Sequence, residues 1–389
     1  MKPINHKERS HALLSASSAH RWLSCPPSAV AVEAYPDQDT DFTREGTLAH
    51  EVAEMVARRR LEEPNGVCVG LLLEQEDGTF IEPPAEMVNC ATEYAEYIME
   101  QIASPNAVVL LEQRVDFSPW VPEGFGTCDC IVIQNDTLII IDYKYGQGVA
   151  VSAKDNPQMK LYALGALNDY GFACDVKHIE MHIFQPRLDS ISDDKLTADE
   201  LLAWAEKTVK PTAEKAFKGK GKYNAGEHCR FCQHAGRCRK LRTICTEFVE
   251  THDLRVGVPV LADFEIAEAL KMEPLITLWL RKIKEQAYNT LMEGGTVPGY
   301  KLVEGKQGNR KWTNEVDVAK KLEAEGYTLE DITETKLLSP SAMDKVLGKK
   351  KAAELLDGYI TRAPGTPTIV PETDKRPAYN RADDFDTLD

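Results

Sequence analysis

The stretch Leu138-Ile139-Ile140-Ile141-Asp142-Tyr143-Lys144 decides the fold of this chain. Four consecutive aliphatic residues predict a buried strand that ends at a carboxylate, and a lysine follows two positions later. Side chains alternate between the two faces of a strand, so we expect Asp142 and Lys144 on the same face. A carboxylate that holds a divalent cation beside an amine that orients a water suits metal-assisted phosphodiester hydrolysis. The competing interpretation is an Asp-x-Lys pair at a solvated strand end.

The segments around this stretch predict a mixed α/β core. Two β-rich runs precede it, helical patterns flank the runs, and Asn135-Asp136 suits a hairpin turn. We therefore expect an α/β fold with a mixed central sheet flanked by helices. The predicted helices cover 15–24, 44–62, 84–103, 157–170 and 198–217, a small hairpin lies near 69–82, and the strands cover 107–117, 127–134, 137–143 and 176–185.

Composition changes along the chain and predicts three parts. Residues 1–248 carry the α/β pattern. Residues 249–363 are mainly helical, with a long amphipathic helix over 263–292 that ends at Gly294-Gly295 and a short strand over 300–304. Residues 364–389 are rich in Pro and Asp, which predicts an extended or disordered acidic tail.

The bulk properties exclude several classes of protein. A net charge of −16 argues against coating nucleic acid or a membrane with the whole surface, so polyanion binding needs a local patch. No apolar run is long enough to span a bilayer, and the polar N-terminus lacks a signal-peptide core. We expect a cytoplasmic protein. Its 10 cysteines do not suggest a disulfide framework in that compartment.

Further candidate ligands lie before the Asp142 strand. His50 falls inside a predicted helix, Asp129 lies in the preceding strand, and Glu112 lies in the first strand. Acids on adjacent strands repel unless a cation lies between them. Oxygen ligands suit Mg²⁺ or Mn²⁺, and a histidine favours Mn²⁺. The alternatives are a surface histidine, an acid that points to solvent and a charge at a strand edge.

Gln158 and Tyr162 lie one helical turn apart on the predicted helix over 157–170. They share a face of that helix and could touch a phosphate or the attacking water. An ordinary helix face is the alternative.

The order of these motifs carries more information than any one of them. Helical Gly-x-x-x-His, then Gly-x-x-Asp, strand-Asp-x-Lys and Gln-x-x-x-Tyr resemble the PD-(D/E)XK nuclease superfamily, in particular its RecB-type exonuclease branch. The resemblance covers roughly residues 11–245 and implies a restriction-endonuclease-like core. It implies a metal-dependent active site with the carbonyl of Tyr143 as a further ligand and Gln158 and Tyr162 in the family's Gln and Tyr positions. The matching active-site positions are His50, Asp129, Asp142 and Lys144.

A second group of candidate ligands is the run Cys229-x2-Cys232-x5-Cys238. Three thiolates leave a tetrahedral site one ligand short, and Cys25, isolated before Pro26-Pro27, is the strongest distant candidate. Cysteine-only ligation suits Zn²⁺ or an iron–sulfur cluster equally, and His228 or His234 could instead join a zinc site.

The resemblance favours a cluster over zinc. Iron–sulfur members of the superfamily place one cysteine before the nuclease core and three after it. This implies a [4Fe–4S] cluster that joins the two ends of residues 1–248, with zinc as the alternative; the implied ligands are Cys25, Cys229, Cys232 and Cys238. The whole chain also resembles an uncharacterised phage-encoded family, which implies a role in phage DNA replication or recombination alongside other proteins of those processes.

Residues 207–242, here called the basic segment, reverse the charge of the chain locally. Tyr223 and Phe231 lie in it and could stack on bases. The alternative is a solvated lysine-rich surface. Its eleven basic residues are Lys207, Lys210, Lys215, Lys218, Lys220, Lys222, Arg230, Arg237, Arg239, Lys240 and Arg242.

These observations predict a metal-dependent DNA nuclease, an exonuclease acting on single strands or duplex ends. Two alternatives remain open. One is a non-catalytic binding module that keeps the fold and the cysteine cluster but only holds DNA or a replication partner. The other is a zinc-stapled protein of unrelated function.

Overall fold

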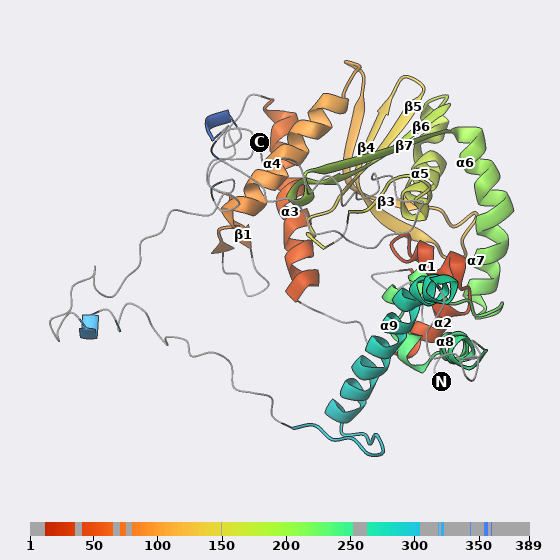
Figure 1. Cartoon of the computed structure of the whole chain (residues 1–389). Helices are drawn as coiled ribbons and strands as arrows, with labels where there is room; N and C mark the ends of the chain where they lie inside the picture. The colour runs from red at the N-terminus through yellow and green to blue at the C-terminus, as the bar shows by residue number, and fades with distance from the viewer. Residues whose placement is uncertain are drawn as a thin grey trace, which may run out of the picture. The chain divides into compact units, whose positions relative to one another are not determined.

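The computed structural model describes residues 12–35, 41–64, 71–74, 80–148, 150–251 and 263–303, with isolated residues beyond (Figure 1). The chain divides into two compact units, Met1–Thr313 and Asn314–Asp389. Only the first unit contains described helices of more than a few residues and described strands. The predicted tail over 364–389 and nearly all of 304–363 lie outside the described residues.

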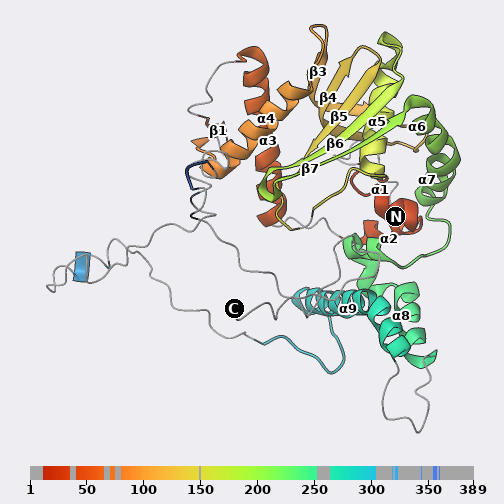
Figure 2. The ribbon, with the colours of Figure 1, turned by 45° about the horizontal axis from the view of Figure 1, so that its top comes forward.

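A five-stranded mixed sheet forms the centre of the first unit and confirms the predicted mixed α/β core (Figures 1 and 2). The strands lie in sequence order across the sheet. Neighbours are antiparallel except for the parallel pair of β5 and β6. The strands are β3 (Val108–Asp116), β4 (Phe125–Gln134), β5 (Thr137–Tyr143), β6 (His178–Gln185) and β7 (Ser190–Thr197).

Parallel strands need a crossover connection, and α5 (Pro157–Tyr170) supplies it between β5 and β6. Asn156 caps α5 by accepting a hydrogen bond from the Gln158 amide, and Pro157 occupies the first helical position. α5 contacts four strands and covers one face of the sheet. The other helices on this side are α1 (Ala19–Ser24), α2 (Ser28–Ala31), α6 (Ala198–Trp204) and α7 (Lys210–Phe217), with a π-helical turn over Ala205–Val209.

Two long helices cover the opposite face of the sheet. α3 (Asp41–Glu62) and α4 (Ala85–Gln101) pack against each other and against buried residues of β4 and β5. The predicted hairpin is present as β1 (Leu73–Glu74) paired with β2 (Phe80–Ile81). Residues of β5 alternate between the layers, because Leu138 and Ile140 pack toward α5 whereas Ile139 and Ile141 pack toward α4.

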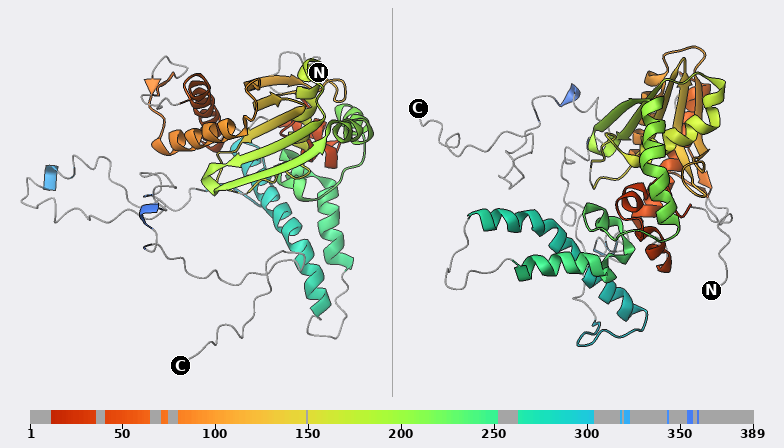
Figure 3. Two further views of the ribbon diagram at one scale, coloured as in Figure 1. Left: turned by 90° about the horizontal axis from the view of Figure 1, so that it is seen from above. Right: turned by 90° about the vertical axis from the view of Figure 1, so that its right-hand side faces the viewer.

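The cysteine run forms two short 3₁₀ turns, Glu227–Phe231 and Gln233–Arg237, that precede α8 (Arg239–Thr251) and α9 (Asp263–Met292). α8 and α9 lie side by side (Figure 3). The backbone of α9 approaches the second turn so closely that a Cβ at Gly236 would overlap the carbonyl of Lys282. The predicted boundary at residue 248 therefore falls inside α8, and the first unit extends to Thr313.

Two further expectations differ from the structure. No strand forms over the described part of 300–304, where Tyr300 makes only an isolated bridge with Val297. The edge strand β7 was not expected. No helix in the described ranges is both long and apolar enough to cross a membrane.

Candidate metal centre

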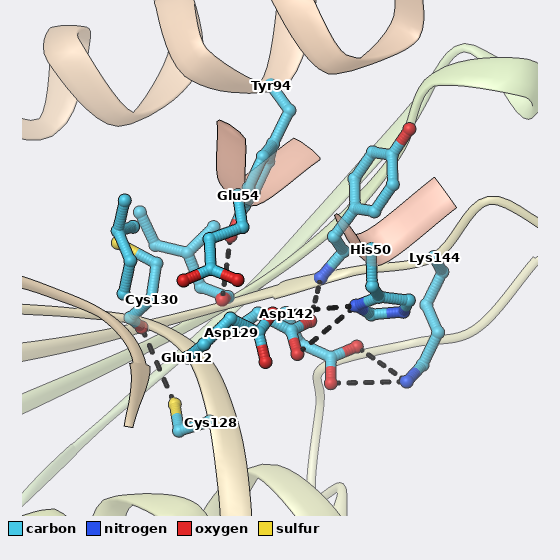
Figure 4. Close-up of polar contacts among 12 residues, drawn as sticks. His50, Glu54, Tyr94, Glu112, Cys128, Asp129, Cys130, Asp142 and Lys144 are labelled. Atoms are coloured by element: carbon cyan, nitrogen blue, oxygen red, sulfur yellow. Dashed lines mark hydrogen bonds and ion pairs between the residues drawn. The ribbon is translucent and has the colours of Figure 1, made fainter. Parts of the chain in front are cut away.

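Three candidate ligands from three elements lie close together. His50 comes from α3, Glu112 from β3 and Asp129 from β4, and one potential ligand atom of each lies within 4.8 Å of the others (Figure 4). His50 Nδ1 is 3.4 Å from Asp129 Oδ1 and 3.9 Å from Glu112 Oε1. An imidazole nitrogen and two carboxylates form a donor set that suits Mn²⁺ or Mg²⁺.

Asp142 and Lys144 lie on the same face of the strand, as their spacing predicts. Lys144 Nζ lies 2.8 Å from Asp142 Oδ2 and 3.1 Å from Oδ1. The Asp142 side chain is only 2% exposed, and Oδ2 receives no well-aligned hydrogen bond although the ammonium is close. A buried carboxylate oxygen with spare acceptor capacity fits the role of a metal ligand.

Asp129 links Asp142 to the His50 side of the site. β4 and β5 are paired at Cys130 and Ile141, so the next positions, Asp129 and Asp142, lie across from one another. Asp129 Oδ2 accepts a hydrogen bond of 2.7 Å from the amide of Tyr143, while Oδ1 faces His50. The amide thus fixes one oxygen of the carboxylate and leaves the other directed at the candidate metal position.

Gln158 and Tyr162 reach the same site from α5. Gln158 Nε2 donates to Asp142 Oδ1 at 3.2 Å and lies 3.3 Å from Tyr162 Oη. The Tyr162 ring packs against Gly126, where an added Cβ would come within 2.8 Å of Cε1. The glycine of the Gly-x-x-Asp motif therefore makes room for the tyrosine of the Gln-x-x-x-Tyr motif.

Glu112 adopts a left-handed backbone conformation with a φ of +48° inside a strand. β3 and β4 are paired on both sides of it, at Leu111 with Cys130 and at Gln113 with Cys128, but not at Glu112 itself. The conformation carries a cost for a residue with a Cβ. It places the carboxylate in the cluster rather than at a solvated strand edge.

Burial and neighbouring charges separate the pKa values of the acids. Burial raises the pKa of Glu112 to about 7, with a further contribution from the Asp129 carboxylate. Burial also acts to raise the pKa of Asp129, but the hydrogen bond and charge of His50 outweigh it and the pKa is lowered. Burial raises the pKa of Asp142, although the neighbouring Lys144 ammonium opposes this.

The two bases of the site keep their protons more strongly than usual. Burial acts to lower the pKa of His50, but its hydrogen bond to Asp129 and the negative charges around it raise the pKa overall. Burial likewise opposes the charge of Lys144, and the Asp142 and Asp129 carboxylates more than compensate, so the pKa of Lys144 is raised. Lys144 is therefore a cation at neutral pH.

The four predicted cysteine ligands line one small pocket. Cys25, Cys229 and Cys232 are buried and Cys238 is partly exposed. The amide of Asn224 donates to Cys25 Sγ at 3.4 Å, which ties the loop before the cysteine run to the end of α1. Burial raises the pKa of the Cys229 thiol to about 11. Four cysteine sulfurs around one pocket form a donor set that, once deprotonated, suits zinc or an iron–sulfur cluster.

The two histidines near these cysteines have other partners. His228 Nε2 lies 3.0 Å from the carbonyl of Asn224, and His234 Nδ1 lies 3.1 Å from Tyr35 Oη. Both histidines line the pocket, each with one ring nitrogen engaged.

The family described as "Protein of unknown function (DUF2800)" matches residues 11–377. The chain belongs to this family. Among solved structures, one described as "Crystal structure of SSO0001" is similar at 16% sequence identity, over 48% of this chain and 96% of that one, with a TM-score of 0.21.

Two arginines of this DUF2800 member were not expected at the sites. Arg21 is buried beside the cysteines and donates to the Ser28 carbonyl at 2.7 Å. Arg187 stacks on Tyr145, with 4.4 Å between the guanidinium and the ring centroid, and pairs with Glu45 of α3 at 3.1 Å. Neither arginine lies in a motif, and the Arg187–Glu45 pair joins segments distant in the sequence.

Proposed function

We propose that this chain is a metal-dependent DNA nuclease of the PD-(D/E)XK type, an exonuclease that hydrolyses phosphodiester bonds. The observation that carries the proposal is the convergence of His50, Asp129 and Asp142 with a half-buried lysine. These residues come from α3, β4 and β5, in the chain order that the family resemblance implies.

The residues of the site have separable roles in this proposal. His50, Glu112, Asp129 and Asp142, with the Tyr143 carbonyl, would hold the cation. A bound Mg²⁺ or Mn²⁺ would lower the pKa of a water and neutralise charge on the scissile phosphate. The Lys144 ammonium would orient the attacking water and stabilise the negative charge that develops on the phosphate.

Gln158 acts as a positioning residue. Its amide holds Asp142 Oδ1, and the hydroxyl of Tyr162 lies next to that amide. Together they would keep the Asp142 carboxylate in one orientation and leave Oδ2 for the cation and Lys144.

A [4Fe–4S] cluster held by the four cysteines belongs to the same proposal. Support comes from the pocket that Cys25 shares with Cys229, Cys232 and Cys238, which brings the start of the first unit to its cysteine run. Protein purified without oxygen should contain iron and acid-labile sulfide. Stoichiometric zinc without iron would instead favour a zinc staple.

The experiment for the nuclease proposal is degradation of linear single- and double-stranded DNA in Mg²⁺, Mn²⁺ or EDTA. We expect Asp142→Asn to abolish metal-dependent degradation. Asp175→Asn is the matched control, because the Asp175 side chain is 88% exposed and pairs only with Lys177 among described residues. DNA binding without degradation by folded, metal-loaded protein would favour the non-catalytic binding module.

A further inference from the structure

Phe231 is exposed between two buried cysteines. In Cys229-Arg230-Phe231-Cys232 the two cysteines are 5% and 7% exposed, whereas Phe231 is 73% exposed. Phe231 is the last residue of a short 3₁₀ turn over Glu227–Phe231, and Arg230 before it is also exposed. The aromatic ring is therefore presented to solvent from a backbone whose cysteine side chains line the cysteine pocket.

One cation lies beside this ring, and three more precede it in the sequence. The guanidinium of Arg230 lies 5.8 Å from the centroid of the Phe231 ring. Lys218, Lys220 and Lys222, on the loop that leads to the pocket, are all exposed. Within the described ranges no acid pairs with these four cations, whereas Lys210 of the same segment pairs with Glu206 at 3.1 Å. In a chain of net charge −16, unpaired cations here leave the segment free to meet a polyanion.

A second exposed ring lies on the same loop. Tyr223 follows Lys222, is 42% exposed, and has its ring centroid 6.3 Å from that of His234. Tyr223 lines the cysteine pocket, and Phe231 lies between two cysteines of that pocket in the sequence. Each ring adjoins a cation in the sequence.

We propose that Phe231, with Arg230 and the basic loop that ends at Tyr223, forms a stacking site for the bases of single-stranded DNA. The proposal rests on the proposed function, because it names the form of DNA that the nuclease takes. An aromatic ring stacks on any unpaired base, and neighbouring cations hold the phosphates. Bases within a duplex are already stacked on each other, so a duplex offers the site only its phosphates.

The test is equilibrium binding of fluorescent oligonucleotides to full-length protein in the Asp142→Ala background. Three probes of equal length are compared: oligo-dT, an abasic strand and a duplex. We expect Phe231→Ala to weaken oligo-dT binding about tenfold or more and to leave binding of the abasic strand and the duplex within about twofold. Phe231→Trp should retain oligo-dT binding, because indole also stacks.

Phe172→Ala is the matched control, since Phe172 is 88% exposed and lies outside the basic segment. It should leave all three affinities unchanged. Equal weakening of the three probes by Phe231→Ala, or no weakening of any, would overturn the stacking site. An RNA strand of the same length shows whether the site distinguishes the sugar.

The outcomes separate this inference from the nuclease proposal. If wild-type protein degrades DNA while Phe231→Ala binds oligo-dT normally, the stacking site is wrong and the nuclease stands. If wild-type protein degrades no DNA while Phe231→Ala loses oligo-dT binding, the nuclease is wrong and the stacking site stands.

Discussion

Glu112 is the residue at which the backbone of β3 leaves the extended conformation. Its φ of +48° interrupts the pairing with β4 opposite Asp129 and brings a third candidate ligand to His50 and Asp129. Strain of this kind persists only where surrounding structure holds it, and it gathers at functional sites. We infer that the strained backbone at Glu112 lowers the stability of the fold and places a carboxylate where it can hold a metal ion.

This strain predicts that Glu112→Gly stabilises the fold and weakens metal binding. Glycine adopts positive φ without the Cβ penalty, so the free energy of unfolding should rise by about 1 kcal/mol. Loss of the carboxylate should weaken Mn²⁺ binding by about tenfold. Denaturant unfolding and calorimetric Mn²⁺ titration measure the two effects.

Asp189→Gly is the control for this substitution. Asp189 also has a positive φ, of 50°, and is exposed in the turn between β6 and β7. It should gain some stability and keep its Mn²⁺ affinity. Unchanged Mn²⁺ affinity in Glu112→Gly would remove Glu112 from the site.

At the scale of single residues, the sequence predicted which side chains share a face, but it did not predict an unusual backbone conformation. Asp142 and Lys144 followed from strand alternation, and Gln158 and Tyr162 from helical spacing. The left-handed turn of Glu112 has no signal in the sequence, because glutamate rarely adopts it. The burial of Arg21 depends on contacts with the later segment around the cysteines, which local pattern does not contain.

β6 contains a buried histidine, His182, that has no role in the proposed metal site. His182 is 4% exposed, and its Nδ1 lies 2.8 Å from Tyr97 Oη on α4. Burial lowers the pKa of His182, although Glu180 and Asp193 oppose this. The neutral form therefore joins α4 to the sheet.

The depressed pKa predicts a loss of stability below pH 6.5. An unfolded histidine binds a proton near pH 6.5, whereas folded His182 does so only at lower pH, so the unfolded state holds more protons in that interval. The contribution of His182 to the free energy of unfolding should fall by up to about 1.4 kcal/mol per pH unit as pH drops below 6.5. It is read as the difference between wild-type protein and His182→Gln, because Glu112, whose pKa is raised to about 7, contributes with the opposite sign. Denaturant unfolding between pH 7 and pH 5 measures this.

His182→Gln should flatten this dependence, and His178→Gln, at an exposed position of the same strand, should preserve it. An unaltered pH dependence in His182→Gln would show that other groups are responsible.

The buried strands, which pack on layers of helices, could be predicted from the sequence. The polar edge strand β7 could not. β5 and α5 have the predicted bounds, because an apolar run and an Asn-Pro start mark them clearly. β7 reads Ser-Ile-Ser-Asp-Asp-Lys-Leu-Thr and alternates between half-buried and exposed positions. Its polar side chains suit the edge of a sheet but resemble a loop in the sequence.

At the scale of the whole unit, the cysteine pocket joins segments from the two ends of the α/β core. Cys25 closes α1, and the other three cysteines follow α7. α9 packs on the same run, so the first unit extends past the predicted boundary at residue 248. The packing of α9 on the cysteine run places α9 in the first unit, and the composition of the sequence does not show this contact.

If the four cysteines hold the proposed cluster or zinc, Cys25→Ser should lose it and destabilise the unit. A group that ties the two ends together restricts the unfolded chain, so its loss should cost about 2 kcal/mol or more. Iron and zinc content with thermal unfolding measure the effect. Cys174→Ser, at a partly exposed position outside the pocket, should change neither. Full metal content in Cys25→Ser would contradict the staple.

The most direct test of the nuclease proposal is cleavage of end-labelled DNA by wild-type protein and Lys144→Ala. Lys177→Ala serves as the control, because the Lys177 side chain is 60% exposed and lies outside the site. We expect a product ladder that needs Mg²⁺ or Mn²⁺, disappears in EDTA, and is weakened about a hundredfold or more by Lys144→Ala alone. Equal cleavage by Lys144→Ala, or cleavage that persists in EDTA, would contradict it.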